Sequence, residues 1–267
     1  MHPPEVRAEA LALVEAGLND CEISRRLGIP RRTILDWRRP PSKRYRRRVI
    51  TETCPRCWRA AKPMRFTSGD YAELLGLYLG DGCISDGART QRLRIHLDAK
   101  YRRMNADIKA LLRRCFPSNP VGQPAAPKSE WSGRSDTLVI LSVYSNHMGC
   151  LFPQHGPGRK HGREIKLEDW QWELVTASPW RFLRGCIRSD GCAFINRTDV
   201  HRAQPYEYLS YHFGNLSKDI IDIFTAACDF AGVHDYRVSG TAGGRWAVRI
   251  NRRASVARMV EHVGLKS

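Results

Sequence analysis

The sequence has no long hydrophobic run, and this absence narrows the class of protein. No stretch of about 18 apolar residues occurs, so no membrane-spanning helix is predicted. The N-terminal residues Met-His-Pro-Pro-Glu lack the basic segment and apolar stretch of a signal peptide. We therefore expect no membrane partner and a cytoplasmic protein, associated with the nucleoid if the source is bacterial.

Acidic residues are also scarce relative to basic ones. The 267 residues include 27 Asp and Glu against 44 Lys and Arg, a net charge of +17. Such a surplus attracts polyanions, so nucleic acid is the expected partner. No aromatic stacking motif of an RNA-binding sheet is present, which favours double-stranded DNA.

The nine cysteines are odd in number and scattered, unlike a disulfide framework. We expect reduced thiols. Cys54 and Cys57 form half of a zinc-knuckle pattern, but no second CxxC or paired histidine lies nearby to complete four ligands. The alternatives are a degenerate zinc ribbon and a simple tight turn, and we predict no bound zinc.

Residues 1–40 are predicted to form a small all-helical, helix-turn-helix DNA-binding domain. Apolar residues recur at spacings of three and four from Val6 to Leu18, and Gly28-Ile29-Pro30 separates a second helix from a third. The third helix should present Arg31, Arg32 and Thr33 to the major groove. The alternative is a three-helix packing module with a solvated basic face. Residues 41–66 follow as a basic linker containing the lone CxxC.

An internal repeat dominates the rest of the chain. Leu-Leu-Gly-Leu-Tyr-Leu-Gly-Asp-Gly-Cys at 74–83 is matched by Leu-Arg-Gly-Cys-Ile-Arg-Ser-Asp-Gly-Cys at 183–192, so Asp81 and Asp190 lie 109 positions apart. Alternating strand-like residues follow each motif at 92–97 and 208–213, then amphipathic helices at 99–115 and 217–232, and further strands at 137–144 and 245–251. Each half ends in a Gly-X-Lys tripeptide, at 158–160 and 264–266.

These two motifs resemble the paired signatures of the LAGLIDADG homing endonuclease family, over residues from about 66 to the C-terminus. The resemblance implies an α+β fold: a duplicated αββαββα core with pseudo-two-fold symmetry, with one half at 67–160 and the other at 161–267. It also implies that the motif helices pack together and that the sheets form a saddle over DNA. Small residues at Gly76, Gly80, Gly185 and Ser189 would let the helices approach closely.

The same resemblance implies the site. Asp81 and Asp190 would be catalytic carboxylates that hold Mg²⁺ together with the backbone carbonyls of Gly80 and Ser189. Outward strand residues available to DNA are Arg92, Arg94, His96, Tyr208, His212, Arg249 and Asn251. The family often places a Lys, Arg or Gln near the last strand of each half, whereas the matching positions here are Ser145 and Asn251.

The sequence therefore predicts a Mg²⁺-dependent, site-specific endonuclease that cuts double-stranded DNA and acts as a monomer, because one chain carries both halves. The alternative is a non-cleaving transcriptional regulator on the same scaffold, similar to the sporulation factor WhiA. The N-terminal helix-turn-helix and the missing strand-end lysines favour that alternative. Retention of both aspartates favours cleavage.

Overall fold

The computed structural model describes residues 4–38, 67–87, 90–125, 137–156, 158–198, 206–240 and 244–266. The chain divides into two compact units, Met1–Val49 and Ile50–Ser267. The predicted linker at 41–66, with Cys54 and Cys57, lies outside the described residues. The predicted bounds of the domains and halves stay predictions.

The first unit consists of three short helices: α1 (Pro4–Glu15), α2 (Asp20–Leu27) and α3 (Arg31–Arg38). Asn19 caps α2, since its side chain accepts the amide of Glu22 while the Glu22 carboxylate accepts the amide of Asn19. Gly28 ends α2 with a φ of 64°, a left-handed conformation that favours glycine. The helices enclose a small core of Ala10, Ile23, Ile29 and Ile34. The predicted three-helix arrangement is confirmed.

The second unit begins with a half built around a three-stranded sheet in the order β1-β2-β3, within the described residues. Its elements are α4 (Ser68–Leu79), β1 (Gly82–Asp86), β2 (Gln91–Asp98), α5 (Arg102–Cys115), β3 (Leu138–Ser145) and α6 (Met148–Leu151). An isolated bridge joins Gly122 to Ser142 of β3, on the far side of β3 from β2. The bridge adds one more backbone pairing to that edge of the sheet.

The other half shows the full αββαββα order, preceded by one extra helix. A single helical turn (Lys160–Gly162) connects the halves. The elements are α7 (Asp169–Ala177), α8 (Pro179–Arg188), β4 (Gly191–Thr198), β5 (Tyr206–Asn215), α9 (Lys218–Phe230), β6 (Tyr236–Gly240), β7 (Trp246–Ile250) and α10 (Arg253–His262). The sheet order is β4-β5-β7-β6. The predicted α+β class with a duplicated core is confirmed, whereas α7 was not predicted.

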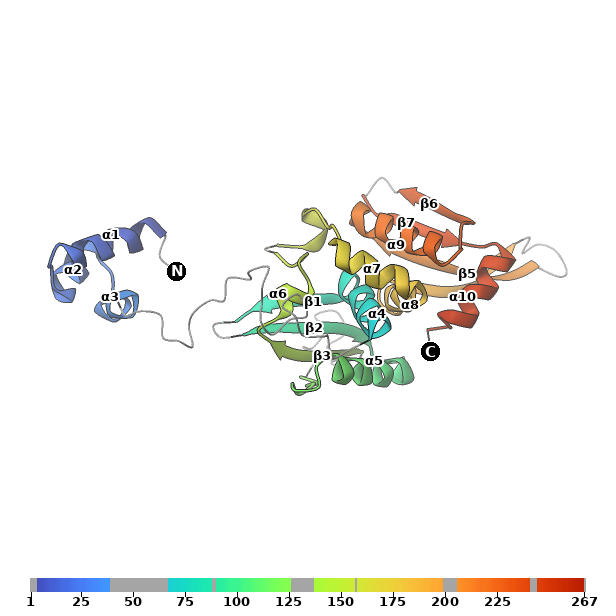
Figure 1. Ribbon diagram of the computed structural model, residues 1–267, viewed down its shortest axis with the longest axis horizontal. Helices are drawn as coiled ribbons and strands as arrows, with labels where there is room; N and C mark the ends of the chain where they lie inside the picture. The colour runs from blue at the N-terminus through green and yellow to red at the C-terminus, as the bar shows by residue number, and fades with distance from the viewer. Residues whose placement is uncertain are drawn as a thin grey trace. The chain divides into compact units, whose positions relative to one another are not determined.

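The two motif helices, α4 and α8, lie side by side between the two sheets (Figure 1). Their backbones touch at glycines: a Cβ added to Gly76 would lie 2.5 Å from the Phe182 carbonyl oxygen, and one added to Gly185 would overlap the carbonyl of Glu73. The contact is reciprocal, as a pseudo-two-fold axis between the helices requires. The close approach predicted from the small residues is confirmed.

Ion pairs join these helices on one side of the glycine contact. The Glu73 carboxylate of α4 is almost fully buried between Arg181 and Arg188 of α8, each 2.9 Å from one of its oxygens. Asp70 accepts from Arg181 at 2.9 Å and from Arg114 of α5 at 2.9 Å. Because α4 supplies the acids and α8 the bases, these pairs favour association of the first half with the second.

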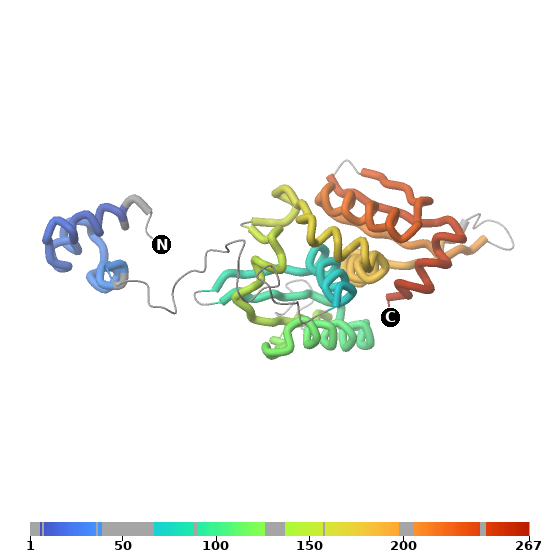
Figure 2. Tube along the Cα trace, viewed as in Figure 1, coloured from blue at the N-terminus to red at the C-terminus, as the bar shows by residue number. Residues whose placement is uncertain are grey.

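One continuous core spans both halves of the second unit. Figure 2 shows the course of the chain through this unit, coloured from cyan to red. The inner faces of both sheets contribute to it, with Leu93, Ile95 and Leu97 from β2 and with Tyr211 and Phe213 from β5. Among the described helices, none has the length and apolar character needed to cross a membrane.

Candidate functional site

The two repeat aspartates occupy equivalent positions just beyond the paired helices. Asp81 follows Gly80, which ends α4 with φ −82° and ψ −99°. Asp190 follows Ser189, which ends α8 with φ −93° and ψ −101°. The backbone therefore turns in the same way at both helix ends, and the two carboxylates lie close enough to interact electrostatically.

Burial makes both carboxyl groups hard to ionise, and the nearby charge of Asp190 adds to this effect at Asp81. Desolvation and the neighbouring Asp190 raise the pKa of Asp81 to about 6, against the attraction of Lys266 and Lys160. Desolvation also raises the pKa of Asp190, although Lys160 and a hydrogen bond from Asn215 act in the opposite direction. The Asn215 amide donates to the Asp190 carboxylate at 2.8 Å. A cation between the carboxylates would relieve this unfavourable charge.

Two lysines bind the carbonyls at the ends of the motif helices. Lys160 Nζ donates to the carbonyls of Gly80 and Gly82, each at 2.7 Å, and to that of Tyr78. Lys266 Nζ donates to the Ser189 carbonyl at 2.7 Å. Burial lowers the pKa of Lys160 to about 8, although both aspartates favour its charged form.

These lysines were not predicted as site residues, because the family resemblance implied cations at the strand ends. Neither Ser145 nor Asn251 is among the groups that shift the pKa of either aspartate. Ser145 instead accepts a hydrogen bond from the amide of His147. The two lysines lie on segments that follow the last strand and the last helix of each half. The repeated Gly-X-Lys ending was the sequence signal that could have identified them.

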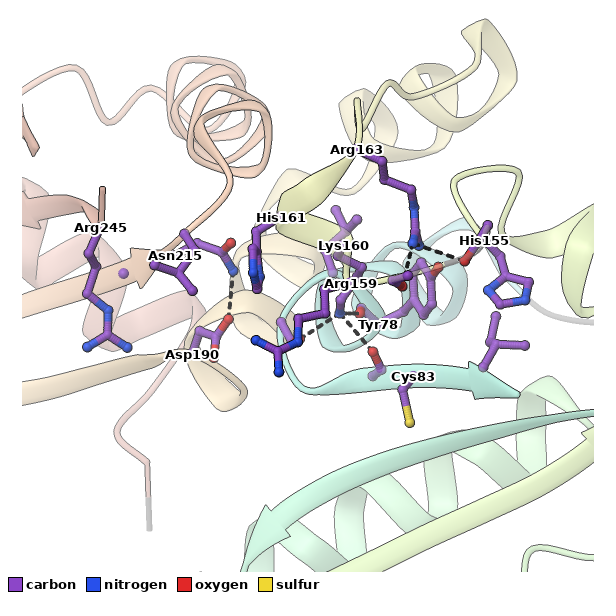
Figure 3. Close-up of a pocket in the computed structure, with 18 residues that line it drawn as sticks. Tyr78, Cys83, His155, Arg159, Lys160, His161, Arg163, Asp190, Asn215 and Arg245 are labelled. Carbon is purple, nitrogen blue, oxygen red and sulfur yellow. Dashed lines mark hydrogen bonds between the residues drawn. The ribbon is translucent and has the colours of Figure 1, made fainter. Parts of the chain in front are cut away.

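The segment that carries Lys160 is held by Arg163. The Arg163 guanidinium donates to the carbonyls of Gln154 at 3.1 Å, Gly156 at 3.0 Å and Gly158 at 2.9 Å. The segment lines a cleft of about 430 Å³ that also includes residues of both motif regions. Figure 3 shows Arg159, His161, Arg245 and Asp190 around this cleft. The cleft wall is therefore basic next to a carboxylate, which suits a phosphate-bearing ligand.

The strand residues predicted to contact DNA lie on the sheet faces that point away from the core. On β2, Arg92, Arg94 and His96 alternate with buried Leu93 and Ile95. The side chain and amide of His96 both lie 3.4 Å from the Asp81 carbonyl, so His96 contacts the turn that carries an aspartate.

The corresponding residues of the other half have a similar placement. Tyr208 and His212 of β5 alternate with buried Tyr211 and Phe213, and Arg249 of β7 pairs directly with His212. Arg249 is exposed, as is Asn251 just beyond β7. In the first unit, Arg31 and Arg32 are exposed at the start of α3, and Thr33 is half-buried. Their contacts with DNA stay predictions.

The oxygen atoms near the two aspartates fit a divalent cation only in part. Two carboxylates that repel one another are suitable oxygen ligands for Mg²⁺. The carbonyls of Gly80 and Ser189, the other predicted ligands, accept hydrogen bonds from lysine ammonium groups. No group of three or more His, Cys, Asp or Glu side chains suited to a metal occurs in the part of the chain that the structure describes.

Comparison with known proteins gives one sequence match and several structural likenesses. A family model described as a homeodomain-like domain matches residues 2–39, in agreement with the predicted helix-turn-helix. No curated protein sequence matches this chain.

Similar solved structures include homing endonucleases and DUF199/WhiA. A variant of the homing endonuclease I-DmoI has a TM-score of 0.45 and 15% identity, and the match covers 73% of this chain and 89% of that one. The N-terminal LAGLIDADG domain of DUF199/WhiA has a TM-score of 0.47 and 14% identity, with 76% and 84% covered. Full-length DUF199/WhiA from Thermotoga maritima has a TM-score of 0.46 and 15% identity, with 76% and 58% covered.

Proposed function

We propose that this protein is a site-specific endonuclease that cuts double-stranded DNA with the aid of a divalent cation, Mg²⁺ being the expected ion. The observation that carries the proposal is the pair of interacting carboxylates, Asp81 and Asp190, at the adjoining ends of two symmetric helices. A basic cleft and two lysine ammonium groups surround them. This arrangement places negative ligands for a cation beside positive groups for a phosphate.

Different residues of the chain would bind the duplex, hold the cation and position the two aspartates. The outward faces of the two sheets would bind the duplex, with arginines neutralising phosphates. Asp81 and Asp190 would hold the cation, which when bound activates water and stabilises the leaving oxygen. Lys160 and Lys266 orient the two aspartate turns through their carbonyl hydrogen bonds and add positive charge beside the scissile phosphates.

The N-terminal helix-turn-helix would supply additional affinity. Arg31 and Arg32 are exposed at the start of α3, the end of a recognition helix that contacts base edges in the major groove. Since one chain carries both halves, we propose a monomer on DNA. Sedimentation of a complex containing two chains per duplex would contradict that stoichiometry.

A second candidate is a DNA-binding transcriptional regulator that does not cleave. It is favoured by the lysines at the Gly80 and Ser189 carbonyls, since an ammonium group there competes with a metal ion for the same oxygens. Both candidates require binding of double-stranded DNA and differ in whether the carboxylates hold a cation.

A cleavage assay separates the candidates. A plasmid library that carries the surrounding genomic region is incubated with the full chain and Mg²⁺ or Ca²⁺, alongside the double variant Asp81→Asn, Asp190→Asn. We expect discrete Mg²⁺-dependent cuts that the double variant does not make. Specific binding by both proteins without a cut at any site would favour the regulator.

A further inference from the structure

The ammonium group of Lys160 is bound at the end of α4 in the way that a metal ion is bound. It donates to the carbonyls of Tyr78, Gly80 and Gly82 and lies 5.0 Å from the centre of the Tyr78 ring. An ammonium group has three N–H donors, so these three hydrogen bonds use all of them. Gly80 and Gly82 flank Asp81 in the sequence. One positive charge is therefore surrounded by the carbonyl oxygens of this aspartate turn.

The other aspartate turn has the same arrangement. Lys266 Nζ donates to the carbonyls of Ser189 at 2.7 Å and Gly191 at 3.3 Å, the two residues that flank Asp190. Its ammonium group also lies over an aromatic ring, 5.5 Å from the centre of Tyr101. Lysines near the ends of helices often bind the last carbonyls, but here the bonds extend past each helix to the residue after the aspartate. The repeated contact thus belongs to both aspartate turns.

Each ammonium group also acts on the carboxylate of the opposite half. Lys266 lowers the pKa of Asp81 more strongly than Lys160 does, whereas Lys160 lowers the pKa of Asp190 more strongly than Lys266 does. Each lysine is therefore bonded to the carbonyls of its own half and close to the carboxylate of the other. A divalent cation that bound the same oxygens would be repelled by the ammonium group already there.

We propose that Lys160 and Lys266 are internal cations that keep a divalent metal ion out of the site until DNA binds, when backbone phosphates draw the ammonium groups away from the carbonyls. Hydrogen bonds between two charged groups are stronger than those to a neutral carbonyl. Because Lys160 donates all three N–H groups to carbonyls, it must release at least one carbonyl to contact a phosphate. DNA and the metal ion would then each increase the affinity of the other by the same factor. The proposal rests on the proposed function, since it concerns the cation of that reaction.

Titration with Mn²⁺, followed by the electron paramagnetic resonance signal of the free ion, tests this coupling. The full chain is titrated alone and in complex with a duplex that it selects from a random pool, at constant ionic strength. The double variant Asp81→Asn, Asp190→Asn measures the Mn²⁺ that binds elsewhere on the protein or the duplex. We expect the duplex to lower the Kd for Mn²⁺ by about 5- to 150-fold, the usual range for coupled sites. Mn²⁺ should lower the Kd for the duplex by the same factor.

Variants of the two lysines test whether they cause the coupling. Lys160→Met and Lys266→Met should each bind Mn²⁺ more tightly in the absence of DNA, and the variant with both changes should lose most of the effect of the duplex. Arg245→Gln is the control. Arg245 lines the cleft and also lowers the pKa of Asp190 through its charge, so its replacement removes a positive charge while both lysines stay at the carbonyls. The effect of the duplex should persist in this control.

The outcomes separate this proposal from the proposed function. A Kd for Mn²⁺ that is the same with and without the duplex would overturn the proposal alone, and this comparison needs only the unmodified protein. Lysine variants that fold but bind Mn²⁺ no more tightly than the unmodified protein in the absence of DNA would also overturn it alone. If the unmodified protein binds no more Mn²⁺ than the aspartate double variant, with or without DNA, the proposed cation site fails as well.

Discussion

Replacing Asp81 by asparagine is expected to stabilise the metal-free protein while removing its proposed activity. Burial and the adjacent Asp190 raise the pKa of Asp81 from 3.8 to about 6. One pH unit of pKa change corresponds to about 1.4 kcal/mol, so holding this carboxylate ionised in the fold costs about 3 kcal/mol near neutral pH. Asparagine has a similar shape and carries no charge, so the variant avoids that cost.

The stability gained by Asp81→Asn should depend on pH. A carboxyl whose pKa is raised on folding destabilises the fold above its folded pKa, and the effect disappears as the pH falls toward the unfolded value. The gain from Asp81→Asn should therefore be full above about pH 6.5 and close to zero near pH 4. Urea unfolding in EDTA at both pH values measures it, and a gain of about 3 kcal/mol corresponds to a rise in Tm of about 6–12 °C.

Asp235→Asn is the matched control, because Asp235 is exposed and its replacement should change stability by less than about 0.5 kcal/mol. If Asp81→Asn left the free energy of unfolding unchanged near neutral pH, or stabilised the protein equally near pH 4, the proposed charge conflict between the aspartates would be refuted.

Three further predictions follow from the helix pair and the site. Gly76→Ala should destabilise the protein by several kcal/mol, because the new Cβ meets backbone atoms of α8 at 2.5 and 2.8 Å. Gly162→Ala should not destabilise it, because open space surrounds Gly162. Thermal unfolding compares the two variants. Glu73→Gln should cost about 1.5–3 kcal/mol in urea unfolding, because half-buried Arg181 and Arg188 lose a nearly fully buried carboxylate and keep only Asp70 and Asp107 as partners. Equal stability of this variant and of exposed Glu173→Gln would contradict that account. At limiting Mg²⁺, the rate of cleavage should fall as the pH drops below about 6, because protonated Asp81 is a poor metal ligand. A cleavage rate independent of pH between about 5 and 7 would argue against metal binding at Asp81.

Local sequence patterns were sufficient to predict helices and strands of the core, because the spacing of apolar residues within a short segment indicates the type of element. Alternation along 92–97 predicted β2, and the three- and four-residue spacing predicted α5 and α9, as the structure has them. The repeated Gly-X-X-X-small spacing predicted the helix contact, because small residues on one helix face permit close backbone approach. The unpredicted α7 begins with a capping box between Glu168 and Gln171, which is a local sequence signal for the start of a helix.

The periodicity of apolar residues could not place the lysines at the site, to which only the repeated Gly-X-Lys ending pointed. Lys160 lies 79 positions after Asp81 in the sequence, and its segment returns to α4 because Arg163 holds the carbonyls of Gln154, Gly156 and Gly158. That return depends on tertiary contacts rather than on periodicity.

The central claim is that Asp81 and Asp190 together hold a divalent cation when DNA is bound. Electron paramagnetic resonance of Mn²⁺, added to the complex of the full chain with a duplex that it binds, tests it directly. The account predicts a bound Mn²⁺ signal that the double variant Asp81→Asn, Asp190→Asn loses while it still binds the duplex. A complex without bound Mn²⁺, or one whose signal is the same in the double variant, would contradict the claim.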